Sequence, residues 1–209
     1  MDSPETVYKY FPELDERQRE MIAALGPLYA EWNAKVNVVS RRDIDNLYER
    51  HVLHSLALAK FMTPVAGTRI LDLGTGGGFP GIPLAIMWPD VRFHLIDRIG
   101  KKIRVATDIA ERIGLANVTL QHGDSGEYHE KVDFVVSRAV MRLDELAKIS
   151  RRNIATRGKN KWPNGLVCLK GGEIEAEMTG TRLPILEVPI SDYFSEEFFT
   201  TKKIVYCKL

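Results

Sequence analysis

Hydrophobic and polar residues along the chain follow two different patterns. In the first sixty or so residues, apolar side chains recur at three- and four-residue spacing, as in amphipathic helices. One such stripe begins after Asp15 and includes Met21, Leu25, Leu28, Tyr29, Trp32 and Val36. A second covers 44–61 and stops before Pro64. Gly26-Pro27 falls inside the first stripe and predicts a kink or an interruption there.

Beyond residue 67, short apolar runs alternate with helical segments. The pattern predicts strands at 69–73, 91–96, 118–121, 132–136 and 166–170, and helices at 81–88, 101–113 and 143–154. Two last strands, at 183–188 and 203–209, follow with little helix between them. This alternation predicts an α/β fold with a mostly parallel sheet, helices on both faces and an antiparallel hairpin at one edge. Because no linker separates the two patterns, we expect an N-terminal helical extension, 1–66, packed on one domain, 67–209.

Composition narrows the class of protein. The 209 residues are 44% hydrophobic and 27% charged, which is ordinary for a globular chain, and no apolar run is long enough to span a membrane. The N-terminus lacks the features of a secretion signal. Cys168 and Cys207 lie in apolar runs without metal-ligand spacing. We therefore expect buried, reduced thiols, no metal and a cytoplasmic protein.

Charge is unevenly distributed. The net charge of +1 excludes a uniformly basic nucleic-acid-binding protein, yet 138–161 holds eight basic residues against two acidic ones. They are Arg138, Arg142, Lys148, Arg151, Arg152, Arg157, Lys159 and Lys161, with Asp144 and Glu145. The segment either docks a polyanion near one site or is a solvated surface, and the sequence alone allows both.

A glycine-rich turn after the first predicted strand is the strongest chemical signal. Asp72 ends the buried run, and glycine fills four of the five positions from 74 to 78. Glycines after a strand allow positive φ and a close approach of the backbone to a ligand. The pattern predicts a cofactor lying against the main chain, with Gly74 and Gly76 in contact with it and Phe79 closing over it. Phe79 is equally consistent with a core residue at the start of a helix.

Two more strand ends point to an adenosine ligand. Asp97 ends the next strand, where a carboxylate can accept hydrogen bonds from both ribose hydroxyls. Segment 123–127, with Gly126 and Glu127, follows a third strand and is positioned to line an adenine pocket. Asp97 alone would fit a simple turn, but in series with the glycine turn the ligand interpretation is favoured.

Two adenosine cofactors compete for this turn. Gly76, Gly78 and Gly81 spell the dinucleotide fingerprint, which needs free helix N–H groups for a pyrophosphate. Pro80 and Pro83 remove two of those donors, and the Asp72 carboxylate would repel a diphosphate while suiting the amino group of a methionine tail. S-adenosyl-L-methionine is therefore favoured, and a nicotinamide-dependent oxidoreductase remains the alternative.

Several separated blocks resemble one known family, the glucose-inhibited division protein B family of bacterial small-subunit (16S) rRNA methyltransferases, which modify guanine at N7. The blocks are 72–84, Trp32-Asn33 with Asn37, Arg50-His51 with Ser55, Asp97 with Lys101-Lys102, Ser137-Arg138-Ala139 and Leu169-Lys170-Gly171. The resemblance implies a Rossmann-like class I S-adenosylmethionine-dependent methyltransferase fold with a seven-stranded sheet. It also implies 16S rRNA or the small ribosomal subunit as partner, and no membrane. At position 54, where many members carry Asp, this chain has histidine, so no acidic role transfers there. Residues 173–209 match only in outline.

The implied chemistry needs no base. Guanine N7 has an in-plane lone pair and no proton, so an enzyme must mainly align N7 with the methyl group and exclude water. The sequence contains neither an Asp-Pro-Pro-Tyr motif for exocyclic amines nor a Pro-Cys pair for pyrimidines. Methylation of another substrate, a small molecule or a protein, and a noncatalytic RNA-binding module remain alternatives.

Candidate site residues follow from both arguments. For cofactor contact we expect Gly74, Gly76, Phe79, Asp97, Gly126, Glu127 and Arg138, and for the catalytic step Arg138, Arg50 and Asn37. By resemblance, Arg138 sits beside the cofactor, contacting its carboxylate or a phosphate of the target. Arg50 is a candidate for an RNA phosphate or the guanine O6 edge.

For other residues the sequence leaves two roles open. His51 lies on the apolar stripe and fits a histidine packed behind the site better than one in it. Asn33 and Asn37, one helical turn apart, either line the base pocket or fasten the helices to the sheet. Trp32, Phe79 and Trp162 are the aromatic residues available to stack on a base, and Trp162 fits equally well as an anchor for its basic loop.

Overall fold

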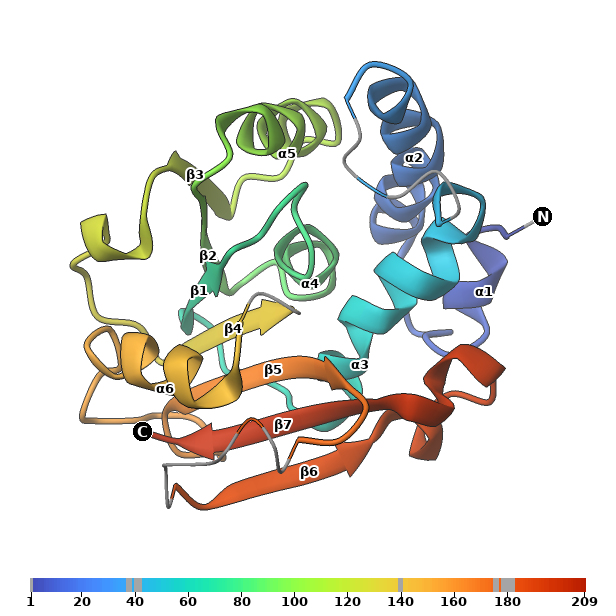
Figure 1. The fold of residues 1–209 in the computed structure, drawn as a ribbon. Helices are drawn as coiled ribbons and strands as arrows, with labels where there is room; N and C mark the ends of the chain where they lie inside the picture. The colour runs from blue at the N-terminus through green and yellow to red at the C-terminus, as the bar shows by residue number, and fades with distance from the viewer. Residues whose placement is uncertain (1, 37–38, 40–42, 139–140, 175–176, 178–182) are drawn as a thin grey trace.

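One mixed sheet organises the molecule. A computed structural model describes residues 2–36, 39, 43–138, 141–174, 177 and 183–209. Its seven-stranded sheet has the order β3-β2-β1-β4-β5-β7-β6 (Figure 1). The strands are β1 Arg69–Leu73, β2 Arg92–Asp97, β3 Val118–His122, β4 Phe134–Arg138, β5 Gly165–Gly171, β6 Ile185–Pro189 and β7 Lys202–Lys208.

Strand direction and order place the functional edge. The strands β3, β2, β1, β4 and β5 are parallel, and β7 is antiparallel to both β5 and β6. The predicted antiparallel pair is confirmed, with β7 inserted between β5 and β6. The chain order reverses between β1 and β4, so a ligand site is expected beyond their carboxyl ends.

Helices cover both faces of the sheet. On one face lie α4, Gly81–Met87, and α5, Gly100–Arg112, and on the other α6, Leu143–Arg151 (Figure 1). Successive side chains of a strand point to opposite faces of the sheet and so pack into two separate hydrophobic cores. Ile70 belongs to the core shared with α4 and α5, and Leu71 to the core shared with α6.

The N-terminal helices share the first of these cores. They are α1 Glu5–Tyr8, α2 Glu16–Asn33 and α3 His54–Phe61, with the short helix η1 Ile44–Asn46 and the π-helical turn η2 Tyr48–Leu53 between them. Leu25 and Tyr29 of α2 and Leu56 of α3 are fully buried in the cluster that contains Ile70. These helices therefore bury their apolar stripes against the α/β layer.

Helix α2 continues through Pro27, so the interruption predicted there is wrong. Asp15 caps the helix, accepting from the Gln18 N–H while the Gln18 side chain accepts from the Asp15 N–H. Proline leaves the Ala23 carbonyl without its helical donor. The Tyr48 hydroxyl replaces it, donating to Ala23 O at 2.8 Å and accepting from Gly26 N at 3.0 Å.

Most predicted bounds hold to within one or two residues, and two boundaries differ for a local reason. Strand β4 begins at Phe134 rather than 132, and α6 ends at Arg151 rather than 154. Val132 and Ile154 instead form an isolated parallel bridge, with Val132 N–H donating to Asn153 O. None of the helices in the described ranges has the length and apolar character to cross a membrane.

Candidate functional site

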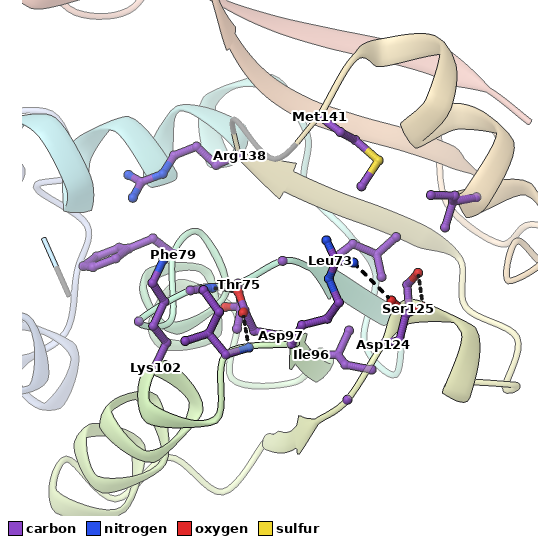
Figure 2. A pocket seen from close by; sticks show the side chains of 17 residues that line it. Leu73, Thr75, Phe79, Ile96, Asp97, Lys102, Asp124, Ser125, Arg138 and Met141 are labelled. Atoms are coloured by element: carbon purple, nitrogen blue, oxygen red, sulfur yellow. Dashed lines mark hydrogen bonds and ion pairs between the residues drawn. The ribbon is translucent and has the colours of Figure 1, made fainter. Parts of the chain in front are cut away.

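A cavity of about 510 Å³ opens beyond the carboxyl ends of β1, β2 and β4 (Figure 2). Its volume is in the range of small-molecule and cofactor sites. Figure 2 shows Phe79, Lys102 and Arg138 toward one end and Asp124 and Ser125 toward the other. The lining residues are Leu73, Gly74, Thr75, Gly76, Gly77, Phe79, Ile96, Asp97, Arg98, Ile99, Lys102, Gly123, Asp124, Ser125, Arg138, Met141 and Ile149.

The glycine turn forms the floor of this cavity. Gly76 has φ +59° and Gly78 has φ +107°, values that side-chain-bearing residues rarely adopt. A Cβ on Gly78 would also clash with the end of the Ile82 side chain. The Gly76 N–H donates to Asp97 Oδ2 at 2.8 Å, so the turn and the end of β2 are joined directly.

Asp72 lies beneath the turn. Its side chain is fully buried and is absent from the cavity lining, so the expected contact with a methionine amino group is not what this geometry provides. Asp72 Oδ2 accepts from Thr75 Oγ1 at 2.6 Å and from Gly81 N at 2.8 Å. Burial raises the pKa of Asp72 to about 7, although these hydrogen bonds oppose the rise. Asp72 therefore holds the turn in place.

The start of α4 has no donors left for a diphosphate. The Gly81 N–H is taken by Asp72, the Ile82 N–H donates to Gly78 O at 2.7 Å, and Pro83 has none. A dinucleotide fingerprint needs these groups for its pyrophosphate. The local geometry therefore argues against the nicotinamide alternative.

Asp97 faces the cavity from the end of β2. Its Oδ1 accepts from Ile99 N and its Oδ2 from Gly76 N, each at 2.8 Å. Both oxygens keep a second lone pair, so the carboxylate can still accept from two hydroxyls on one ligand. Its predicted contact with a ribose stays a prediction.

The far end of the cavity is built by the segment after β3. Gly123, Asp124 and Ser125 line it, while Gly126 and Glu127, the two residues predicted to touch the cofactor, do not. The Gly126 N–H donates to Asp124 Oδ1 at 2.8 Å, and Glu127 Oε1 accepts from Asp124 N at 2.6 Å. These two hydrogen bonds cap the short helix η3, Ser125–Glu127. Gly126 and Glu127 therefore hold the lining residues Asp124 and Ser125 in place without lining the cavity themselves.

Arg138 brings a positive charge to the opposite end. The guanidinium carbon lies 5.0 Å from the centre of the Phe79 ring, and Nη2 lies 2.8 Å from His51 Nδ1. Burial lowers the pKa of Arg138 to about 10, which leaves it a cation at neutral pH. Within the described ranges no carboxylate lies at ion-pair distance from it. The half-buried guanidinium can therefore bind an anionic group of a ligand.

His51 supports Arg138 from behind. Burial, with a further contribution from the Arg138 charge, lowers the pKa of His51 to about 3, so the ring is neutral. Because Arg138 can only donate, His51 Nδ1 is the acceptor and Nε2 carries the proton. The ring also packs 5.2 Å from Phe79.

Phe79 lies both in the cavity lining and in the core. It lines the cavity, yet it is only 4% exposed and stacks on Tyr29 at 4.8 Å. Tyr29 in turn donates to Gly77 O at 2.7 Å. Helix α2 thereby fixes the outer part of the glycine turn.

Arg50 and Asn33 lie outside the cavity lining. Arg50 Nη1 pairs with Asp43 Oδ1 at 2.8 Å, and the Arg50 carbonyl lies 3.5 Å from Arg138 Nη1. Helix α2 ends at Asn33, whose Oδ1 accepts from Val39 N at 3.0 Å. The prediction for Asn37 falls outside the described residues.

Two tryptophans anchor structure. Trp32 Nε1 donates to Asp108 Oδ2 at 2.6 Å and ties α2 to α5. Trp162 stacks on Phe61 at 4.7 Å and packs 5.2 Å from Tyr206. For Trp162 this geometry favours the anchor over the base-stacking role.

The basic segment is divided between opposite edges of the sheet. Arg138 lies at the carboxyl end of β4, but Asn160 Oδ1 accepts from Val65 N and Thr68 Oγ1, just before β1 begins. Lys159 and Lys161 flank Asn160, so a five-residue strand, roughly 17 Å, separates them from the cavity edge. The loop therefore lies away from the cavity edge, which favours the solvated-surface alternative for it.

Sequence reasoning missed several lining residues. Ile99 is exposed and lies two residues after Asp97, and Met141 projects from beyond β4 (Figure 2). An apolar residue just after a strand that ends in an acid could have been predicted from the sequence to contact the adenine ring. Met141 had no such signal, because its position depends on Lys170 of the neighbouring strand β5, whose Nζ donates to the Met141 carbonyl at 2.5 Å. Over the described ranges, no cluster of three or more His, Cys, Asp or Glu is arranged to hold a metal.

Two solved structures that share this fold are named as methyltransferases. An S-adenosylmethionine-dependent methyltransferase from Aquifex aeolicus aligns with a TM-score of 0.56 at 16% identity, over 81% of this chain and 98% of that one. A putative O-methyltransferase from Nostoc punctiforme gives 0.57 at 14% identity, over 75% and 56%. At such identities the likeness shows the fold, which is the predicted class I methyltransferase fold.

Sequence relatives are much nearer. The family model described as GidB, rRNA small subunit methyltransferase G, matches residues 18–191. The ribosomal RNA small subunit methyltransferase G of Bacteroides thetaiotaomicron is 56% identical over 98% of this chain and 100% of that protein. The corresponding protein of Cytophaga hutchinsonii is 48% identical over 96% and 97%. The chain therefore belongs to the GidB family of small-subunit rRNA methyltransferases.

Proposed function

We propose that this protein transfers a methyl group from S-adenosyl-L-methionine to N7 of a guanine in 16S rRNA, as free RNA or within the small ribosomal subunit. The observation that carries the proposal is that the Asp97 carboxylate and the Arg138 guanidinium line the same cavity. A carboxylate at a strand end suits ribose hydroxyls. The guanidinium over Phe79, which has no ion-pair partner among the described residues, suits the carboxylate of a methionine tail. The cofactor supplies an electrophilic methyl carbon next to a positively charged sulfur.

The residues around Arg138 favour a target atom that carries no proton. His51 is neutral, but its Nδ1 lone pair is engaged by Arg138, and its pKa of about 3 makes it a weak base. Asp72 is buried under the turn and does not reach the cavity. Guanine N7 needs no base, so a site that orients and desolvates its reactants is sufficient.

Individual roles follow from this arrangement. Gly74, Gly76, Phe79 and Asp97 would hold the cofactor, and Gly126 and Glu127 would act by shaping the loop of Asp124. Arg138 would neutralise the cofactor carboxylate. Arg50, beside Arg138, and Asn37 would contact the RNA.

Domain organisation and location complete the proposal. Residues 1–66 would be an extension that supports the methyltransferase domain, 67–209, through Tyr29 and His51, both of which contact Phe79. Both cysteines are buried and free, as expected for a reducing compartment. We propose that the protein acts in the cytoplasm, where its rRNA substrate is found.

Methyl transfer from tritiated S-adenosyl-L-methionine tests the substrate. We expect label in 16S rRNA or small subunits from a strain that lacks the modification, and nuclease digestion followed by mass spectrometry should give 7-methylguanosine. Fully modified subunits are the control and should take up little label. Label found only in protein or in small molecules would refute the rRNA assignment.

A further inference from the structure

Two cations contact the ring of Phe198, which lies outside the cavity lining. The Arg50 guanidinium carbon is 5.6 Å from the centre of the Phe198 ring, and Lys202 Nζ is 4.8 Å from the same centre. An aromatic face attracts a cation through its quadrupole. The ring therefore helps to keep two positive charges close together although they repel each other. We call Arg50, Phe198 and Lys202 the cation cluster.

The cation cluster lies on the functional edge of the sheet. Lys202 begins β7 and pairs with Gly171, the last residue of β5, so it shares the carboxyl edge with Arg138 (Figure 1). Phe198 belongs to η6, Glu197–Thr201, which leads into β7. On the other side, the Arg50 carbonyl lies 3.5 Å from Arg138 Nη1, and Arg138 lines the cavity. A strand bound across the cavity mouth would thus meet the cation cluster next.

Negative charge near the cation cluster is sparse. Asp43 pairs with Arg50, whereas Lys202 has no carboxylate at ion-pair distance among the residues with defined positions. His54, whose ring lies 5.5 Å from Phe198, adds no positive charge of its own, because burial and the charges of Arg138 and Lys202 keep its pKa well below the usual value. The described surroundings thus leave a surplus of positive charge.

We propose that Arg50 and Lys202, held on the Phe198 ring, bind a phosphodiester of the RNA strand that carries the target guanine. The inference rests on the proposed function, and it assigns Arg50 to a phosphate rather than to the guanine O6 edge. Phosphate contacts fix the register of a protein on nucleic acid and leave sequence discrimination to other groups. The cation cluster would accordingly set the position of the strand while the cavity holds the cofactor.

Salt-dependent RNA binding tests the proposal. The probe is the undermodified 16S rRNA or subunit that the wild-type protein methylates, with Kd measured across a series of salt concentrations. For Lys202→Gln we expect weaker binding and a slope of log Kd against log salt reduced by roughly 0.7 to 0.9. Lys159→Gln, the same charge change at the opposite edge of the sheet, is the matched control and should keep the wild-type slope.

Two further readouts separate the cation cluster from the cofactor site and from folding. S-adenosylhomocysteine should bind Lys202→Gln as it binds the wild type, since Lys202 does not line the cavity. Phe198→Tyr, which keeps the ring, should retain affinity for RNA, and Phe198→Leu should lose several-fold. Equal slopes for Lys202→Gln and Lys159→Gln overturn the inference. Absence of any rRNA methylation by the wild-type protein overturns the proposed function itself.

Discussion

Arg138 concentrates the charge chemistry of the cavity in one side chain. Its guanidinium packs over Phe79, and one nitrogen is fixed by the neutral His51. The orientation is therefore set before any ligand arrives, which lowers the entropic cost of binding an anionic group. The consequences can be tested with single substitutions.

Arg138→Ala should weaken cofactor binding with the fold retained. A hydrogen bond to a charged group contributes about 1.5 to 3 kcal/mol, so we expect S-adenosylhomocysteine to bind about 10- to 100-fold more weakly by calorimetry, with kcat/KM for methyl transfer lowered at least as much. Arg138→Lys keeps the charge without the planar fork and should lose less. Near-normal turnover of Arg138→Ala, with an unchanged melting temperature, would remove Arg138 from the site.

Asp72 should impose a pH dependence on stability. Its ordinary pKa of 3.8 is raised to about 7 in the folded protein, chiefly by burial. Between about pH 4 and 7 the folded state holds a proton that the unfolded chain has released. The free energy of unfolding should therefore fall as pH rises across this window, by about 1.4 kcal/mol per pH unit, and change no further above it.

Asp72→Asn removes this titration while keeping an oxygen for Thr75 and Gly81. Urea unfolding of both proteins at several pH values isolates the contribution of Asp72, because the other groups cancel in the difference. The stability of the wild type relative to the variant should decline from pH 4 to 7. Parallel curves would mean that Asp72 ionises with an ordinary pKa.

At the scale of elements, helix α2 owes its continuity to a residue from another segment. Tyr48 supplies the donor that Pro27 lacks and also accepts from the Gly26 N–H. Gly26 is required there, since a Cβ would lie 2.7 Å from the Tyr48 hydroxyl oxygen. Pro27 and Gly26 thus fit the helix only together with Tyr48.

A double-mutant cycle measures this dependence. Tyr48→Phe leaves the Ala23 carbonyl without a donor and should cost about 1 to 3 kcal/mol of unfolding free energy. Gly26→Ala should also destabilise the wild type, through overpacking against the hydroxyl. In the Tyr48→Phe background the same change should cost less, because the hydroxyl is gone and alanine favours helix. Additive effects in denaturant unfolding would contradict this account.

How far the sequence predicts the elements depends on where their signals lie. The bounds of β1 were predicted correctly because its apolar run and the glycine turn are contiguous. The continuity of α2 was not, because Tyr48 lies more than twenty residues from Gly26. In the site, the turn, Asp97 and Arg138 follow from strand ends. The burial of Asp72 does not, because it results from packing under Gly81.

At the scale of the whole molecule, charge is sorted by edge of the sheet. Arg50, Arg138 and Lys202 belong to the carboxyl edge, and the loop of Lys159 and Lys161 to the amino edge. Local charge in the sequence could not distinguish the edges, because α6 carries the chain from one to the other between Arg138 and Lys159.

The loop of Lys159 and Lys161 should be dispensable for RNA methylation. Replacing both lysines by glutamine should leave the KM for rRNA and its salt dependence close to wild type, since the loop faces away from the cavity. Initial rates at two or three salt concentrations are sufficient to measure this. A several-fold rise in KM would mean that the substrate wraps around to the amino edge.

The position of β7 has a consequence for the order in which the strands pair during folding. Strand β6 pairs with β7 and not with β5, although β7 is synthesised after β6. As the chain folds, β6 therefore has no edge of the sheet to pair with until β7 has docked on β5, and the edge of β5 stays open until then. Such unpaired edges invite association between nascent chains. The sheet is therefore completed only when the last strand, Lys202–Lys208, pairs with β5 and β6.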